Sequence, residues 1–266
     1  FLTADSMIYG SLSPGFKAGG FSLQNGTATD ESRPYGEENV TNYEIGLKSE
    51  FLDKRARINA AAFYTEYEDF QNASYAGLIF VVNNAELVTV SGIEIDSTFI
   101  LTPSLIANVN LAYIDTIYDK YTGGQCYYGK APDNDLDQCD LSGENLPSAT
   151  RIKGNIALNY YRPMLSGEFY TRLDYLYNGD ANNSASLDPR AETSSYGITN
   201  LRLGWQNGQW DLALWGKNPS DKNAVAQTAP ANIHTQVDRN VGAAEGSYQA
   251  FTIPPRSIGL TARRYF

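Results

Sequence analysis

The strongest constraint in this sequence is an alternation of apolar and polar residues with a period of two, which recurs along the whole chain. In the segment 42–51, NYEIGLKSEF, the apolar residues Tyr43, Ile45 and Leu47 are separated by charged or small residues. Successive side chains of a β-strand point to opposite faces, so such a segment forms a strand with one apolar and one polar face. Helical periodicity is nearly absent. The sequence therefore predicts an all-β protein.

About ten antiparallel strands can be placed by this alternation. The expected strands cover residues 6–16, 42–51, 58–65, 93–99, 105–113, 152–160, 169–177, 199–205, 210–217 and 257–266. One face of these strands is apolar, and the other carries charged residues together with Ser and Thr. If these strands cross a membrane, the charged face is expected to line a lumen, because an unpaired charge costs about 2–4 kcal/mol in the middle of a bilayer.

The connections between the expected strands alternate between two kinds. Short turns are expected at 52–55, 101–104, 163–167 and 206–209, and long polar loops at 17–40, 70–85, 119–149, 178–195 and 219–252. Outer-membrane barrels combine short periplasmic turns with long extracellular loops in this way. The sequence therefore predicts a transmembrane antiparallel β-barrel, with a soluble β-sandwich as the alternative.

Aromatic residues at the ends of the expected strands support the barrel. Tyr and Trp favour the boundary between membrane and water because their rings are amphipathic. The aromatic residues in such positions are Phe51, Tyr64, Phe99, Tyr113, Tyr160, Tyr177, Trp205, Trp210 and Phe266.

Composition excludes several other classes of protein. The formal net charge is −10, which argues against a nucleic-acid partner. No run approaches 18 apolar residues, so a transmembrane helix is not expected. The single histidine, His234, lies in a long loop with no serine-containing elbow nearby, and there are only two cysteines. We therefore expect no catalytic site and no enzymatic activity.

The loop 119–149 contains both cysteines, Cys126 and Cys139. Outside the cytosol two such thiols are expected to oxidise to a disulfide, with two buried free thiols as the alternative. The same loop carries carboxylates whose spacing matches positions 1, 3, 5 and 12 of a calcium loop, although Gln138 stands where such loops have Gly. These residues, a candidate structural calcium site, are Asp133, Asp135, Asp137 and Glu144. The alternative is an acidic loop that meets lipopolysaccharide through bridging cations. No other cofactor is expected.

Several strings of the sequence resemble the C-terminal barrel of TonB-dependent receptors. SMIYGSLSPGFKAGGF, near the start, resembles the family pattern Tyr-x-Ser-x-Ser-x-Gly-Phe-Lys-x-Gly-Gly-Phe, and 37–70 resembles its Tyr-Glu-x-Gly-x-Lys hairpin. NNAELVTVSGIEID at 83–96 resembles the next strand, and WGKNPSDK at 215–222 resembles the Lys-Asn-Leu-x-Asp exit of the penultimate strand. The resemblance extends over the chain, and its motifs follow in the family's order.

The resemblance implies a larger barrel than ten strands. The family's barrels have 22 strands around an N-terminal plug. Residues 1–266 would then be the C-terminal part of such a barrel, without the plug, and a self-contained ten-stranded barrel is the alternative. In the larger barrel, 6–16 and 257–266 would be sheet edges that do not pair with each other. Phe266 would be the terminal aromatic signal for barrel assembly, although the family more often has an aromatic or apolar residue at the position of Arg264.

The resemblance also implies a function. Receptors of this family use energy from TonB to import a scarce nutrient, such as a ferric siderophore or similar chelate, across the Gram-negative outer membrane. The implied partners are membrane lipid and lipopolysaccharide, the TonB complex through the missing N-terminal region, and a small-molecule chelate. The loop residues that we expect to contact the ligand are Tyr75, Tyr118, Tyr127, Tyr128, Arg239 and Tyr248. A passive porin, or a structural barrel that anchors a surface assembly, is the alternative function.

Overall fold

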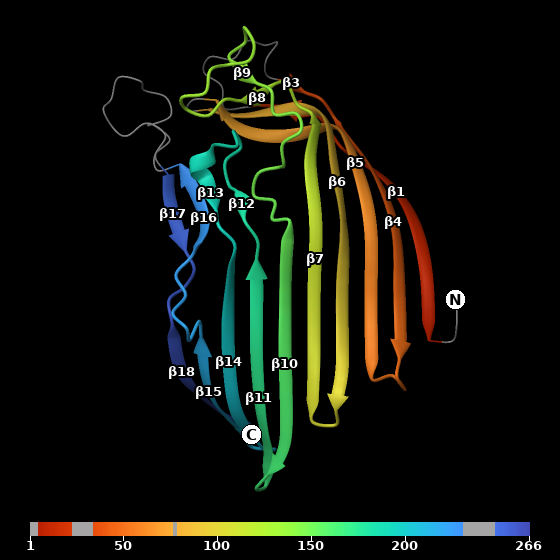
Figure 1. Cartoon of the computed structure of the whole chain (residues 1–266), viewed down its shortest axis with the longest axis vertical. Helices are drawn as coiled ribbons and strands as arrows, with labels where there is room; N and C mark the ends of the chain where they lie inside the picture. Colours follow the sequence, from red (N-terminus) through yellow and green to blue (C-terminus); the bar gives the residue numbers. More distant parts are fainter. Residues whose placement is uncertain (1–4, 23–33, 77–78, 231–247) are drawn as a thin grey trace.

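Ten strands form one continuous antiparallel sheet in this computed structural model (Figure 1). The structure describes residues 5–22, 34–76, 79–230 and 248–266. The strands lie in the sheet in chain order: β1 (Ser6–Lys17), β4 (Glu38–Phe51), β5 (Ala56–Ala76), β6 (Ile79–Thr102), β7 (Leu105–Lys120), β10 (Ile152–Met164), β11 (Gly167–Asn178), β14 (Tyr196–Gln206), β15 (Trp210–Lys217) and β18 (Ser257–Arg264). The predictions of an all-β fold and about ten strands are confirmed.

The two ends of the sheet differ in their connections. Short turns join β4 to β5, β6 to β7, β10 to β11 and β14 to β15 at one end, which we call the turn end. The other end, the loop end, carries four small strand pairs and a 3-10 helix (Figure 1). These elements are β2 (Gly20–Phe21) with β3 (Pro34–Tyr35), β8 (Gly124–Gln125) with β9 (Gln138–Cys139), β12 (Ala181–Asn182) with β13 (Glu192–Thr193), β16 (Val225–Pro230) with β17 (Tyr248–Thr252), and η1 (Pro189–Ala191). The expected alternation of short turns and long loops is confirmed at all but one connection.

The exception is the loop expected over 70–85, which is wrong. β5 continues to Ala76 and β6 begins at Ile79, and the two strands are paired over this segment from Phe70 with Ala85 to Ala76 with Ile79. Alternation does not reveal this strand, because the segment joins the polar residues Gln71 and Asn72 to a continuous apolar run at 79–82. Gln71 helps to hold the extension, since its side-chain amide donates a hydrogen bond to the carbonyl oxygen of Ala18 at 3.0 Å.

The strand register separates an apolar face from a polar face. One row across five neighbouring strands consists of Ile45, Ala62, Ile93, Tyr113 and Ile152. A row three residues away, on the other face, consists of Lys48, Asn59, Asp96, Asn110 and Asn155. Side chains of the apolar face are not covered: Ile45 is 60% and Ile93 is 51% exposed. An exposed apolar face that extends over a whole sheet fits contact with lipid.

The aromatic residues expected at strand ends lie on this apolar face, except Phe266, which lies beyond the end of β18. Alternation along each strand puts them in the same set of rows as Ile45 and Ile93, as shown by the pairings of Phe51 with Ala56 and of Ala56 with Phe99. Tyr43 and Tyr64 are cross-strand neighbours, with ring centroids 6.5 Å apart.

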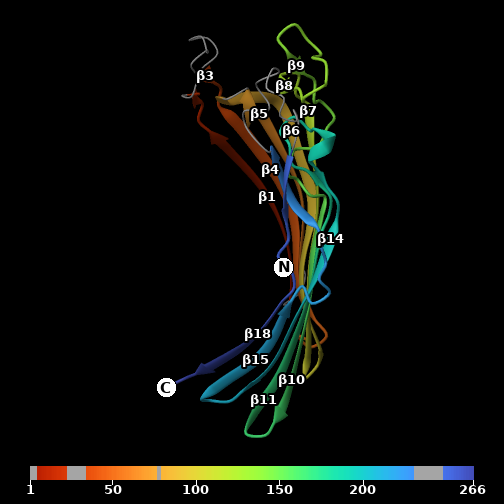
Figure 2. The same cartoon turned by 90° about the vertical axis from the view of Figure 1, so that its left-hand side faces the viewer.

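The sheet is a curved wall with two open edges (Figure 2). β1 pairs only with β4, and β18 pairs only with β15, among the strands that the structure describes. The expectation that 6–16 and 257–266 form separate edges is confirmed. None of the described segments is a helix long and apolar enough to cross a membrane.

The assignment of the two faces can be tested by thiol labelling. Leu212 and Leu214 lie on the apolar face, while Asp211 and Lys217 lie on the polar face. We expect a charged maleimide to modify a Lys217→Cys variant of the complete protein in membranes and to leave Leu214→Cys unmodified, because lipid excludes the reagent. The two native cysteines do not interfere, since they form a disulfide. Labelling of position 214 but not 217 would contradict the assignment.

Candidate functional site

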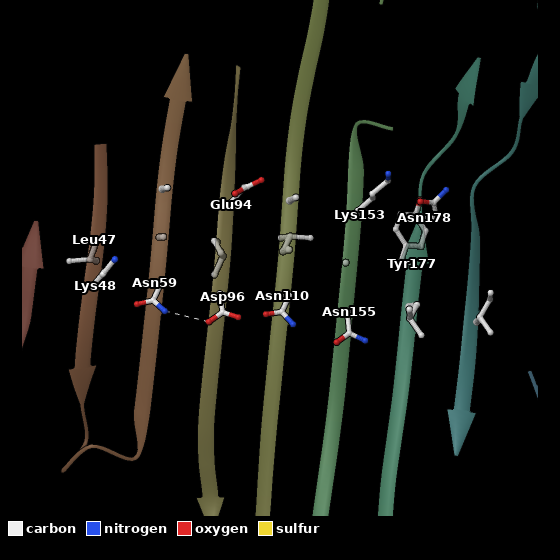
Figure 3. Close-up of a pocket in the computed structure, with 18 of the residues that line it drawn as sticks. Leu47, Lys48, Asn59, Glu94, Asp96, Asn110, Lys153, Asn155, Tyr177 and Asn178 are labelled. Carbon is white, nitrogen blue, oxygen red and sulfur yellow. Dashed lines mark hydrogen bonds between the residues drawn. The ribbon is translucent and has the colours of Figure 1, made fainter. Parts of the chain in front are cut away.

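The polar face contains a hollow of about 620 Å³ at mid-height, lined by residues from β1 to β14. Figure 3 shows that polar side chains from neighbouring strands stand in a row along it. Asn59 donates a hydrogen bond to Asp96 through Nδ2, at 3.4 Å. Ala61 and Ala112 also line the hollow, and their short side chains leave the space open. This part of the wall can therefore offer hydrogen bonds to polar material inside a lumen.

Near the turn end, the polar face carries a charged cluster around Asp211. Tyr170 donates a hydrogen bond from its hydroxyl to Asp211 Oδ1 at 2.7 Å. Arg202 and Arg263 lie 3.6 and 4.0 Å from Asp211 Oδ2. Charges of this kind are costly on a lipid-facing surface and inexpensive in an aqueous lumen. Their place on the polar face supports the predicted separation of lumen from lipid.

A small hydrophobic cluster stabilises the loop end. Its buried members come from β6, β7 and the loop that follows β7, and they are Ala85, Val88, Tyr118, Tyr121, Cys139 and Leu141. Tyr118 has 0% exposure, so the prediction that it contacts a ligand is wrong. It packs against Tyr121, with ring centroids 4.9 Å apart. Loop tyrosines are ambiguous in a sequence because the same ring can fill a core or face solvent.

The predicted disulfide between Cys126 and Cys139 is present, with Cα atoms 5.0 Å apart. It joins the segment next to β8 to β9, so the chain between them forms a closed loop. Asn134 orders the tip of this loop, because its Oδ1 accepts hydrogen bonds from the backbone N–H groups of Leu136 and Gln138 at 2.9 and 3.1 Å. The disulfide and this turn make the segment a defined structure rather than a free loop.

The four carboxylates of the candidate calcium site are not gathered into a ligand set. Asp133 Oδ2 accepts a hydrogen bond from the backbone N–H of Asp140 at 3.0 Å and lies 3.4 Å from Lys130 Nζ. Within the described residues there is no group of three or more His, Cys, Asp or Glu side chains that could hold a metal ion. The calcium site stays a prediction, which a comparison of hydrogen exchange over 131–145 with and without a chelator would test.

Asp188 is the centre of a polar cluster that ties three loop-end segments together, and we call it the Asp188 clamp. Its carboxylate accepts hydrogen bonds from Arg190 Nη2 at 2.7 Å and from the Tyr248 hydroxyl at 2.9 Å. Arg190 also donates to the carbonyl oxygen of Tyr128, in the disulfide loop, at 3.0 Å. The clamp therefore connects η1, β17 and the disulfide loop.

Asp188 is 1% exposed, and a buried carboxylate needs such partners to stay charged. Burial raises the pKa of Asp188, but hydrogen bonds from Arg190 and Tyr248 outweigh it and hold the pKa below its ordinary value. The charged form is therefore the stable form of the clamp.

The other candidate ligand contacts lie in different parts of the structure. Tyr128 and Tyr248 take part in the clamp, and Tyr127 is half-buried beside it. Tyr75 lies in β5, with its backbone paired to Phe80. Arg239, like His234, lies outside the described residues. Phe266 is exposed beyond the end of β18. Ligand contact stays a prediction for the five candidates Tyr75, Tyr127, Tyr128, Arg239 and Tyr248. The role of Phe266 as a signal for barrel assembly also stays a prediction.

Sequence reasoning missed Asp188, Arg190 and Gln71. A signal for the first was present, because Asp188 precedes Pro189 at the start of η1 and accepts a hydrogen bond from the backbone N–H of Arg190, as a capping aspartate does. Its long-range partner Tyr248 is 60 residues away, and no local pattern points to that contact.

An antiparallel sheet with one exposed apolar face, one polar face and opposite turn and loop ends defines the wall of a transmembrane β-barrel. The family model described as "TonB dependent receptor-like, beta-barrel" matches residues 2–218. The chain belongs to this family. Its members are outer-membrane receptors, and this chain is an outer-membrane protein.

Similar proteins agree with this assignment. The pesticin receptor of Yersinia pestis is 28% identical over 109 residues, which are 41% of this chain and 16% of the receptor. The ferric yersiniabactin uptake receptor FyuA from Yersinia pestis has a TM-score of 0.73 at 19% identity, over 100% of this chain and 36% of that chain. The siderophore receptor PiuA from Acinetobacter baumannii has a TM-score of 0.70 at 19% identity, over 99% of this chain and 34% of that chain. The chain thus spans well under half the length of these relatives.

Replacing Asp188 with Asn should loosen the clamp. The variant loses the charge that Arg190 and Tyr248 bind, at a local cost of about 1–3 kcal/mol. We expect faster hydrogen exchange over 184–193 and 248–252, with no change in the matched variant of exposed Asp135→Asn. Because the folded pKa of Asp188 is lowered, its stabilisation is present above the ordinary aspartate range and is lost as the pH falls through the lowered value. Loosening already at pH 6 would contradict this account.

Removing the disulfide should affect the loop and leave the wall intact. A closed loop of this size constrains the unfolded chain by about 3 kcal/mol. In a variant with Cys126→Ala and Cys139→Ala, we expect faster exchange over 122–141. Exchange in β10 and β11 provides the control and should stay as in the parent protein. Loss of the barrel itself would show that the disulfide has a larger role.

Proposed function

We propose that this chain is part of a receptor that imports a scarce nutrient across the outer membrane with energy from TonB. Membership of the TonB-dependent receptor family carries this proposal. The separation of an exposed apolar face from a polar face supports it, because a transport barrel needs lipid on one side and an aqueous path on the other. The chain itself contributes a wall and capture loops, and we propose no catalytic step for it.

We infer that the ten strands are the C-terminal part of a 22-stranded barrel with a plug. In hydrocarbon, an unpaired backbone N–H or C=O group costs several kcal/mol, so the free edges of β1 and β18 call for further strands. The hollow on the polar face would then face the plug. The remaining partners are membrane lipid and lipopolysaccharide on the apolar face, and the TonB complex through a region outside this sequence.

The cargo that we propose is a ferric siderophore or a similar metal chelate. Relatives with similar walls are described as a ferric yersiniabactin uptake receptor and a siderophore receptor. The loop end is the natural capture surface, because it carries the disulfide loop and the Asp188 clamp above the polar face. Their cross-links hold the capture surface in one shape, which lowers the entropic cost of binding.

Uptake measurements with the complete gene test this function. We expect deletion of the gene to abolish uptake of radioactive iron from at least one ferric chelate and the intact gene to restore it. Restoration should fail in cells without TonB, because the transport step needs that energy. TonB-independent uptake with no saturation would favour the passive porin, and unchanged uptake of every chelate together with loss of a surface assembly would favour the structural barrel.

A further inference from the structure

A second recess, of about 320 Å³, lies at the loop end between the segments 144–151 and 180–194. β12 and β13 stand above β11 and β14, so the recess lies at the outer end of the wall (Figure 1). It is separate from the mid-height hollow and shares no residue with it.

The walls of this recess are held in place by hydrogen bonds. The backbone N–H of Ser148 donates to the carbonyl oxygen of Asn182 at 2.6 Å and so joins the two segments. Thr193 donates from its hydroxyl to the carbonyl oxygen of Ala181 at 3.1 Å and so joins β12 to β13. The Asp188 clamp also holds the segment 180–194, through the bonds of Asp188 and Arg190. The recess is therefore formed before any ligand arrives.

Among the residues that the structure describes, the lining of the recess carries a net negative charge. Arg151 is the one basic residue of this described lining, and it pairs with Asp115, whose Oδ1 lies 3.1 Å from its Nε. Three carboxylates remain in the lining: Glu144, Asp180 and Glu192. In the part of the chain that the structure describes, no lysine or arginine forms an ion pair with any of them.

The surrounding sequence has the same sign. The two segments that build the loop end here, 119–149 and 178–195, contain nine acidic and three basic residues. Exposed like charges raise the local concentration of cations and repel anions. The recess is thus a formed cavity in a region of negative charge, which favours a positively charged ligand.

The lining of the recess does not suit a bare metal ion. Three carboxylates that could bind one ion would lie together, and the described residues contain no such group. Amide and hydroxyl groups of Asn145, Asn182 and Thr193 also line the recess. Separated carboxylates in a lining that also offers hydrogen-bonding groups suit a polyatomic cation, such as an ammonium or guanidinium group on a larger solute.

We propose that this recess binds a positively charged amine or guanidinium group of the imported solute, so that the receptor prefers cationic chelates over neutral or anionic ones. This inference rests on the uptake function proposed above and specifies its substrate class. Glu192 and Asp180 are the specificity-determining residues, since both are exposed in the lining and neither has an ion-pair partner in the described structure.

The recess can be probed first without a chelate. Hexaamminecobalt(III), a polyatomic trivalent cation, is added to the complete receptor, and hydrogen exchange is compared with that in the anion hexacyanocobaltate(III). We expect the cation to slow exchange over 144–151 and 180–194, and the anion to have no effect. A variant with Asp180→Asn and Glu192→Gln should lose the protection, whereas Asp53→Asn, which changes an exposed acid at the turn end, should keep it. Absence of protection in the parent protein, or protection that survives the double variant, would overturn the inference.

A matched pair of chelates then tests the substrate preference. A ferric trihydroxamate with a free primary amine is a cation, and its N-acetyl derivative is neutral with the same iron shell. We expect the amine to bind about tenfold more tightly at low salt, and the difference to vanish in the double variant. Equal affinities, or tighter binding of the acetylated chelate, would overturn the inference. TonB-dependent uptake of both chelates would leave the proposed transport function in place, so the two failures can be distinguished.

Discussion

The structure depends on the need of every backbone N–H and C=O group to find a partner where no water is available. A sheet meets this need strand by strand, and the ten strands described here pair without interruption from β1 to β18. Side chains are then free to differ between the faces, and the register rows of Ile45 and Lys48 show how completely they do so. Among the described strands, β1 and β18 each pair on one side only, and in our proposal further strands of a closed barrel pair with their free edges.

The two ends of the wall obey different physical rules. At the turn end, connections only reverse the chain. At the loop end, the chain leaves the support of lipid and must stabilise itself in small units. It does so with the Tyr118 cluster, a disulfide, and a buried carboxylate whose partners come from separate segments. Residues placed on such units are held by these contacts, although they belong to loops.

Much of this fold can be predicted from the sequence because membrane strands obey a local rule. Alternation alone places the ten strands and assigns Leu214 and Lys217 to opposite faces. The Cys126–Cys139 disulfide also follows from local spacing. The rule fails where lipid ends: the β5–β6 extension does not alternate, and Tyr118 is buried by residues that alternation does not bring together. The acidic recess is least predictable, because Glu144 and Glu192 come to line the same recess only through the folding of two loops.

The position of the disulfide has a consequence for how the protein is made. Both cysteines belong to one connection, thirteen residues apart, and the bond crosses no strand of the ten-stranded sheet. The two thiols can therefore oxidise while the chain is still unfolded in the periplasm. The resulting disulfide does not fix which strands become neighbours. A cross-link between distant strands would have to wait for insertion or risk trapping a wrong topology. The disulfide can therefore form before or after membrane insertion. Where thiol oxidation is slow, the sheet can insert first and the disulfide of the loop can form afterwards.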